Sequence, residues 1–152
     1  MENSLPEISD CFRMIVVVDS NIIFSSLLKE NHSFINHILN SPEVNFVTTG
    51  FLFVEIFKLK DRIVNYSNLP EENILRIMHN LFNCISLRSE NLISMESKAK
   101  ARGLCSDIDI KDLPFVALTI DLKGRLWTGD QVLRTRLIEK GFTDFYSFHS
   151  CQ

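Results

Sequence analysis

Short apolar segments rich in β-branched residues alternate along the chain with longer segments of mixed polarity. Met14 to Val18 reads MIVVV, a continuous apolar run typical of a strand that is buried on both faces. Comparable runs follow at Val44 to Thr48, Cys84 to Leu87, Arg125 to Thr128 and, more weakly, Thr143 to Phe148. The pattern predicts about five strands.

The longer segments carry apolar residues at every third or fourth position, which is the spacing of amphipathic helices. We expect helices over Gly50 to Tyr66, Leu69 to Phe82, Leu92 to Arg102, Leu113 to Leu122 and Gln131 to Lys140. Gly103 and Gly141 follow two of them, where a helix C-cap favours left-handed backbone. Strands that alternate with helices imply an α/β fold, a three-layer α/β/α sandwich around a mainly parallel sheet.

Length and composition fit one soluble domain. The 152 residues are 45% hydrophobic, enough to bury a core without disulfides or structural metal. We expect a single domain over residues 1–152, with its core at about 14–148 and a flexible tail at 1–13. No apolar run approaches the roughly 20 residues of a membrane span, and the acidic start differs from a secretion signal. The cysteines form no Cys-x-x-Cys pair, so the reducing cytoplasm suits them: Cys11, Cys84, Cys105 and Cys151.

The charge balance argues against a protein that coats nucleic acid through a general basic surface. Formal net charge is −3 and the pI is near 5.8. Basic residues do gather in two groups, which we interpret as solvated helix faces: Lys58, Lys60 and Arg62, and Arg134, Arg136 and Lys140.

Acidic side chains follow the expected strands. In an open parallel sheet the ligand crevice lies at the carboxyl ends of the strands. Asp19 follows the first strand directly, and Asp130 is separated from Thr128 only by Gly129, which lacks a side chain and so lets backbone and ligand approach. These two acids are therefore expected at one edge of the sheet.

Further acids are expected near the same edge. Glu55 comes early in the helix after the second strand, on or beside its apolar face. Asp112 begins the helical segment that carries Pro114 in its first turn, and Asp107 and Asp109 lie just upstream.

Four acids in one crevice, Asp19, Glu55, Asp112 and Asp130, would repel one another unless a cation compensated them. Lys111 is the only adjacent basic residue, so a hard cation with oxygen ligands, Mg²⁺ or Mn²⁺, is the expected counter-charge. Such an ion activates water and clamps a phosphodiester. Taken singly, Asp19, Asp112 and Asp130 are better interpreted as helix N-caps, Glu55 as an ordinary helix carboxylate, and Asp107 and Asp109 as solvated loop residues, so the metal site is predicted by the joint arrangement.

Three segments resemble the signature segments of PIN-domain nucleases. They are VVVDSNIIFSSLL from Val16, FLFVEIFKLK around Glu55, and DIDIKDLPFVALTIDLKGRLWTGDQVL from Asp107. The resemblance covers Met14 to about Phe148. It implies a Rossmann-like sandwich and Mg²⁺- or Mn²⁺-dependent cleavage of RNA.

By position, the resemblance assigns the acidic set to Asp19, Glu55, Asp112 and Asp130, with Asn21 and Thr128 as polar neighbours. Asp107, Asp109 and Asp112 compete for the third acidic position; Asp112 fits best, and Asp109 would add an outer contact. Many prokaryotic members of this size are toxins of toxin-antitoxin pairs, so the resemblance also implies a homodimer and a small antitoxin partner.

Two other classes remain open. A haloacid-dehalogenase-like phosphatase also begins with a strand that ends in Asp and closes with a Gly-Asp metal site, but it wants a second acid where this chain has Asn21. A PIN-like binding or regulatory module without catalysis would suit the acidic pI.

Overall fold

The computed structural model describes residues 13–28 and 33–148. The tail expected at residues 1–13 lies outside the described residues except for its last position.

A four-stranded, fully parallel sheet forms the centre of the described chain. Its strands are β1 (Met14–Val18), β2 (Val44–Thr49), β3 (Ser86–Arg88) and β4 (Arg125–Trp127), in the order β3-β2-β1-β4. The three valines of β1 are fully buried because the strand has a neighbour on each edge and helices on both faces. The apolar run that predicted this strand therefore reflects burial on both faces.

The fifth expected strand is reduced to a single bridge between Leu126 and Phe145. Leu126 N donates to Asp144 O at 2.8 Å, and Tyr146 N donates to Leu126 O at 2.9 Å. Three residues after this bridge, the Phe148 ring stacks on His37 with centroids 3.9 Å apart. The sheet therefore has four strands where about five were expected, and the weakest expected strand contributes a single bridge.

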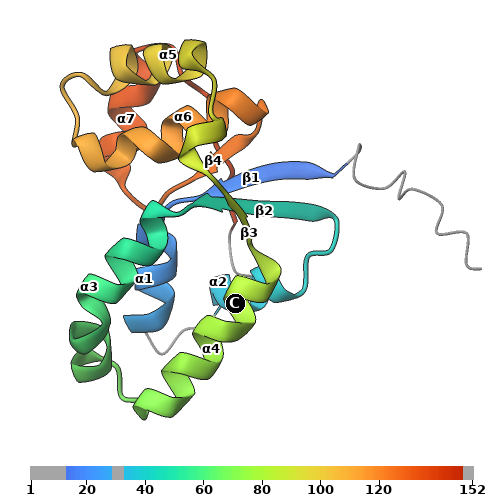
Figure 1. Ribbon diagram of the computed structural model, residues 1–152, viewed down its shortest axis with the longest axis vertical. Helices are drawn as coiled ribbons and strands as arrows, with labels where there is room; N and C mark the ends of the chain where they lie inside the picture. The colour runs from blue at the N-terminus through green and yellow to red at the C-terminus, as the bar shows by residue number, and fades with distance from the viewer. Residues whose placement is uncertain (1–12, 29–32, 149–152) are drawn as a thin grey trace, which may run out of the picture.

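Helices cover both faces of the sheet, which confirms the three-layer α/β/α architecture (Figure 1). One layer contains α1 (Ser20–Leu28), α2 (Ser33–Leu39), α3 (Phe51–Tyr66) and α4 (Glu71–Cys84). The other contains α5 (Met95–Cys105), α6 (Leu113–Leu122) and α7 (Gln131–Glu139). Two short 3-10 turns, η2 (Glu90–Leu92) and η3 (Ile110–Asp112), precede α5 and α6.

A tight turn brings β4 against β1. Lys123 ends α6 in the left-handed region, with φ of 52°. At Gly124 a Cβ atom would lie 2.8 Å from the Ile15 carbonyl oxygen, closer than real Cβ contacts allow. Only glycine therefore lets the chain pass β1 at this point.

Two expected element ends differ in the structure, and a third is confirmed. The expected strand at Cys84 to Leu87 begins two residues later, since Cys84 still belongs to α4 and the Ile85 amide closes its last turn on Leu81 O at 3.0 Å. Gly103 does not cap α5, which continues to Cys105 because that side chain is still buried in the core. Gly141 does follow α7 with φ of 91°, as the sequence predicted.

None of the helices in the described ranges is both long enough and apolar enough to cross a bilayer.

Candidate functional site

The order of the strands places a topological switch point at β1. The chain moves from β1 to β2 on one side and returns to β4 on the other, so the loops after β1 and β4 diverge. Ligands of open α/β sheets bind in the crevice that such a divergence leaves at the carboxyl edge. Asp19 follows β1 directly, and Asp130 follows β4 after two residues and begins α7.

Asp19 is a buried carboxylate at this edge of the sheet, with 3% of its surface exposed. Its Oδ2 accepts a hydrogen bond from Thr128 Oγ1 at 2.8 Å, and its Oδ1 accepts one from Ser20 Oγ at 3.4 Å. Burial raises the pKa of Asp19, and the charge of Glu55 adds to the rise, while the hydrogen bonds from Thr128 and Ser20 oppose it. The side chain is thus held in one orientation, while burial makes its ionised form less favourable.

The Thr128 hydroxyl joins the two strand ends. It donates to Asp19 and accepts from Asn21 Nδ2 at 3.2 Å and from the Asp130 amide at 3.1 Å. Asn21 Oδ1 in turn accepts from the Gly129 amide at 3.0 Å. A Cβ at Gly129 would be 3.6 Å from Asn21 Oδ1, an ordinary contact, so packing within this chain does not require glycine there.

Asp130 is the N-cap of α7. One oxygen, Oδ1, accepts from the Val132 and Leu133 amides at 3.0 and 3.1 Å. The capping interpretation therefore holds for Asp130. It uses only one carboxylate oxygen and leaves the other available to a ligand.

Asp112 ends η3 and precedes α6, but its side chain makes no capping hydrogen bond. Burial first, and then the charges of four other carboxylates, raise the pKa of Asp112 from 3.8 to about 7. Those carboxylates belong to Asp19, Asp109, Asp130 and Glu55. The acids that the sequence singled out are therefore close enough to repel one another at Asp112, and capping does not explain this residue.

Glu55 lies one turn into α3 and is half-buried. Its Oε2 is buried without a hydrogen-bond partner, and within the described residues Thr49 Oγ1 is the only other buried side-chain oxygen in this state. Thr49 ends β2, and Glu55 lies in the first turns of α3, the helix that follows it. An unpaired buried carboxylate oxygen costs free energy, so its position indicates a partner of another kind, such as a cation.

Asp109 and Asp107 lie at the margin of the site. Asp109 is exposed and caps η3, with Oδ1 accepting from the Lys111 amide at 3.0 Å, while its charge still acts on Asp112. Asp107 forms an ion pair with Lys140, which lowers the pKa of the Asp107 carboxyl. Of the three candidates for the third acid, Asp112 is therefore the one that is half-buried beside the other carboxylates, whereas the charge of Asp107 is compensated by Lys140.

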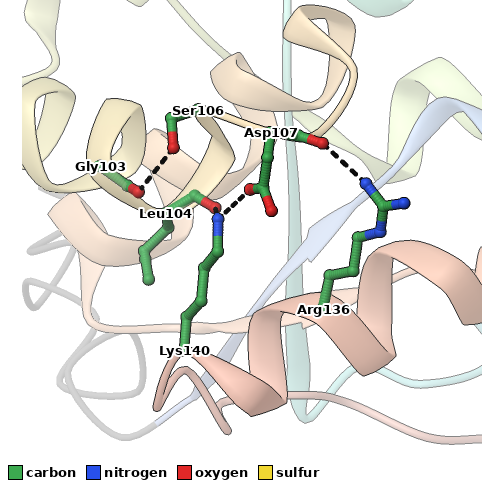
Figure 2. Close-up of polar contacts among 6 residues, drawn as sticks. All are labelled: Gly103, Leu104, Ser106, Asp107, Arg136 and Lys140. Carbon is green, nitrogen blue, oxygen red and sulfur yellow. Dashed lines mark hydrogen bonds and ion pairs between the residues drawn. The ribbon is translucent and has the colours of Figure 1, made fainter.

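Figure 2 shows how the loop that carries Asp107 is fastened to α7. Arg136 Nη1 donates to Asp107 O at 2.7 Å, and Lys140 Nζ donates to Leu104 O at 2.8 Å and pairs with the Asp107 carboxylate. Arg136 and Lys140 are thus more than a solvated helix face, because they hold the end of α5 against α7. Lys60 similarly pairs with Glu71 at 2.8 Å.

None of the four clustered acids forms an ion pair with a basic side chain in the part of the chain that the structure describes. The donor set, which consists of carboxylate oxygens with one unpartnered buried atom, fits a hard divalent cation. In 13–28 and 33–148, however, no three His, Cys, Asp or Glu side chains already converge closely enough to enclose a metal ion. A metal at this site would have to draw the carboxylates together.

Ser20 adjoins Asp19 in the Asp-Ser-Asn run and donates to it, a contact that the sequence pattern did not predict. The ion pair of Asp107 with Lys140 was not predicted either, because no local pattern links two residues so far apart in sequence.

The chain belongs to the PIN domain family, whose pattern matches residues 17–141. A chain in the crystal structure of VapBC2 from Rickettsia felis bound to a DNA fragment from their promoter has the same fold, with a TM-score of 0.61. The two sequences are 16% identical, and the match covers 82% of this chain and 93% of the other. No match was found among the curated proteins.

Proposed function

We propose that this PIN domain is a divalent-metal-dependent ribonuclease that hydrolyses RNA phosphodiester bonds with Asp19, Glu55, Asp112 and Asp130. The observation that carries the proposal is the mutual repulsion of the acids at Asp112, with no basic side chain paired to any of the four within the described residues. Membership of the family, whose members are typically nucleases, supports the same conclusion.

Mg²⁺ or Mn²⁺ would be held by the carboxylates of Asp19, Glu55, Asp112 and Asp130, with Asp109 as an outer contact. When bound, such an ion lowers the pKa of water and offsets the negative charge of the phosphodiester. Glu55 Oε2 would then have the partner that it lacks among the described residues. Asp130 could contribute its second oxygen while the first keeps the α7 cap.

The chain's own polar groups fix the geometry of this site. Thr128 orients Asp19 through the 2.8 Å hydrogen bond, and Asn21 orients Thr128. Because Asp19 is buried and held from two sides, it loses little side-chain freedom when a ligand arrives. Without metal, burial and the neighbouring carboxylates raise the pKa of Asp112 to about 7, and a bound cation would lower it and hold the carboxylate ionised as a ligand.

Cleavage of a labelled single-stranded RNA by the purified protein tests the proposal. Activity should require Mg²⁺ or Mn²⁺ and disappear with EDTA, and Asp19→Asn should lower the rate at least a hundredfold without unfolding the protein. The exposed Asp144→Asn variant is the matched control and should cleave normally. An unchanged rate for Asp19→Asn would show that this residue is not essential.

A toxin role in a toxin-antitoxin pair, with a homodimer and a small antitoxin partner, is the biological setting that we propose for this activity. Family membership and the fold shared with VapBC2 of Rickettsia felis support it. Expression of the chain in a bacterial host should arrest growth, whereas expression of Asp19→Asn should not. Sedimentation of the purified protein tests the dimer.

A regulatory PIN module without catalysis is the second candidate. The observation that favours it is that no three potential ligand side chains in the described ranges converge on one point. Mn²⁺ titration separates the two: the ribonuclease should gain thermal stability with Mn²⁺, and Asp19→Asn should lose that gain. The binding module would show no gain in either protein.

A further inference from the structure

The carboxyl edge of the sheet continues beyond the acids to a groove beside β3. This β3 groove has a volume of about 530 Å³. It is lined by the residue that links β2 to α3 and by the end of β3 with the turn after it: Gly50, Leu87, Arg88, Ser89, Glu90 and Asn91. It therefore lies at the same edge as the acidic cluster, on the side of β2.

Arg88 is the basic side chain of this groove. It is the last residue of β3, pairs in register with Thr49, and is exposed. Among the described residues its guanidinium has no hydrogen bond, ion pair or ring contact, in contrast to Arg134, Arg136 and Lys140. A cation with five donors and no protein partner is available to an anionic ligand.

The strand order sets the distance from Arg88 to the acids. Strands in a sheet are about 4.8 Å apart, so the end of β3 lies roughly 10 Å from the end of β1, where Asp19 stands. A single strand carries one phosphate at every nucleotide, so this span corresponds to at most a few nucleotides. A strand whose phosphate lies at the acids therefore brings a neighbouring phosphate to Arg88.

We propose that the β3 groove binds the backbone of the RNA strand a few nucleotides from the phosphate that is cut, with Arg88 as the phosphate contact. The proposal rests on the proposed ribonuclease function and adds the path of the substrate. Arg88 supplies attraction that the acidic cluster cannot supply, because a single strand carries a negative charge at every nucleotide.

The other groove residues fit a nucleotide rather than a free anion. Leu87 is 54% exposed beside Arg88 and adds an apolar side chain to the lining of the groove. The Asn91 side-chain amide can donate to phosphate or sugar oxygens. Glu90 carries the opposite charge in the same groove and weakens its attraction for RNA.

Binding of a fluorescent 12-nucleotide RNA in EDTA, measured by anisotropy between 20 and 200 mM KCl, tests the groove without cleavage. Arg88→Ala should weaken binding about tenfold and reduce the slope of log affinity against log salt by about 0.7, the value for one lost phosphate contact. Arg88→Lys should restore the slope, and Glu90→Gln should tighten binding. Arg62→Ala is the matched control, because Arg62 is exposed but lies near the far end of α3.

The outcomes separate this inference from the proposed function. If the wild-type protein cleaves RNA but Arg88→Ala keeps its affinity and salt slope, RNA binding by the β3 groove is refuted and the ribonuclease proposal is kept. If cleavage is absent but Arg88→Ala still has a reduced salt slope, RNA binding by the groove is supported and the ribonuclease proposal is refuted. A wild-type protein that does not bind the RNA, or an equal loss in Arg62→Ala, also overturns the groove.

Discussion

Asp112→Asn should stabilise the protein in the absence of metal, although it removes an acid from the candidate site. Burial and four neighbouring carboxylates make the ionised Asp112 unfavourable in the fold. A rise in pKa from 3.8 to about 7 would correspond to about 4 kcal/mol for a fully buried group. Asp112 is only half-buried, so solvent screening reduces the expected gain to about 1–2 kcal/mol.

The stability gained by Asp112→Asn should depend on pH. Because the pKa of Asp112 is raised in the fold, protonation stabilises the folded state, fully below the unfolded pKa of 3.8 and no longer once the pH passes about 7. Metal-free wild-type protein therefore carries the full penalty at pH 8 and little of it near pH 4. The advantage of Asp112→Asn should be largest at pH 8 and shrink as the pH falls through this window.

Urea unfolding in EDTA at pH 8 and pH 4.5 measures both quantities. Asp144→Asn, at an exposed position, is the control and should change the unfolding free energy by less than about 0.5 kcal/mol at either pH. The reasoning is refuted if Asp112→Asn is no more stable than the wild type at pH 8, or if its gain is the same at both values.

Three further predictions concern a hydrogen bond at the site, the close approach of Gly124 to β1, and the cap of α7. Thr128→Val removes the hydroxyl that donates to Asp19 at 2.8 Å, and should cost about 1–3 kcal/mol in thermal unfolding and at least a tenfold loss in RNA cleavage; full activity would contradict the orienting role. Gly124→Ala should cost about 1–3 kcal/mol because its Cβ would lie 2.8 Å from a carbonyl oxygen, whereas Gly103→Ala, with open space in α5, should be neutral or stabilising. Asp130→Ala should lower the unfolding free energy by about 1 kcal/mol because it removes the α7 cap. Asp130→Asn should keep most of that stability while losing activity. If Asp130→Asn is as unstable as Asp130→Ala, the cap does not explain the loss.

The parts of this structure that depend on local pattern could be predicted from the sequence. The MIVVV run gave β1, and its end fixed the place of Asp19 after the strand. The same reasoning placed Asp130 after β4, since each position depends only on where a short apolar run stops. Alternation of such runs with helical spacing was enough for the layered parallel fold.

Features that depend on tertiary contacts could not be predicted in this way. The burial of Glu55 Oε2 is set by how α3 packs, and the length of α5 by the burial of Cys105, which the glycine at 103 does not signal. The sequence favoured Asp112 over Asp107 and Asp109 as the third acid, but only by its place before the helix. What distinguishes them is the ion pair between Asp107 and Lys140, made by folding rather than by spacing.

The hydrogen bond from Thr128 to Asp19 spans 109 positions of the chain, from the end of the first strand to the end of the last. During synthesis, Asp19 emerges from the ribosome long before the segment that orients it. No amino-terminal fragment that stops short of β4 can assemble the acidic cluster, however stable it is. Any activity of this cluster therefore begins only after β4 and the first turn of α7 have left the ribosome and folded against β1.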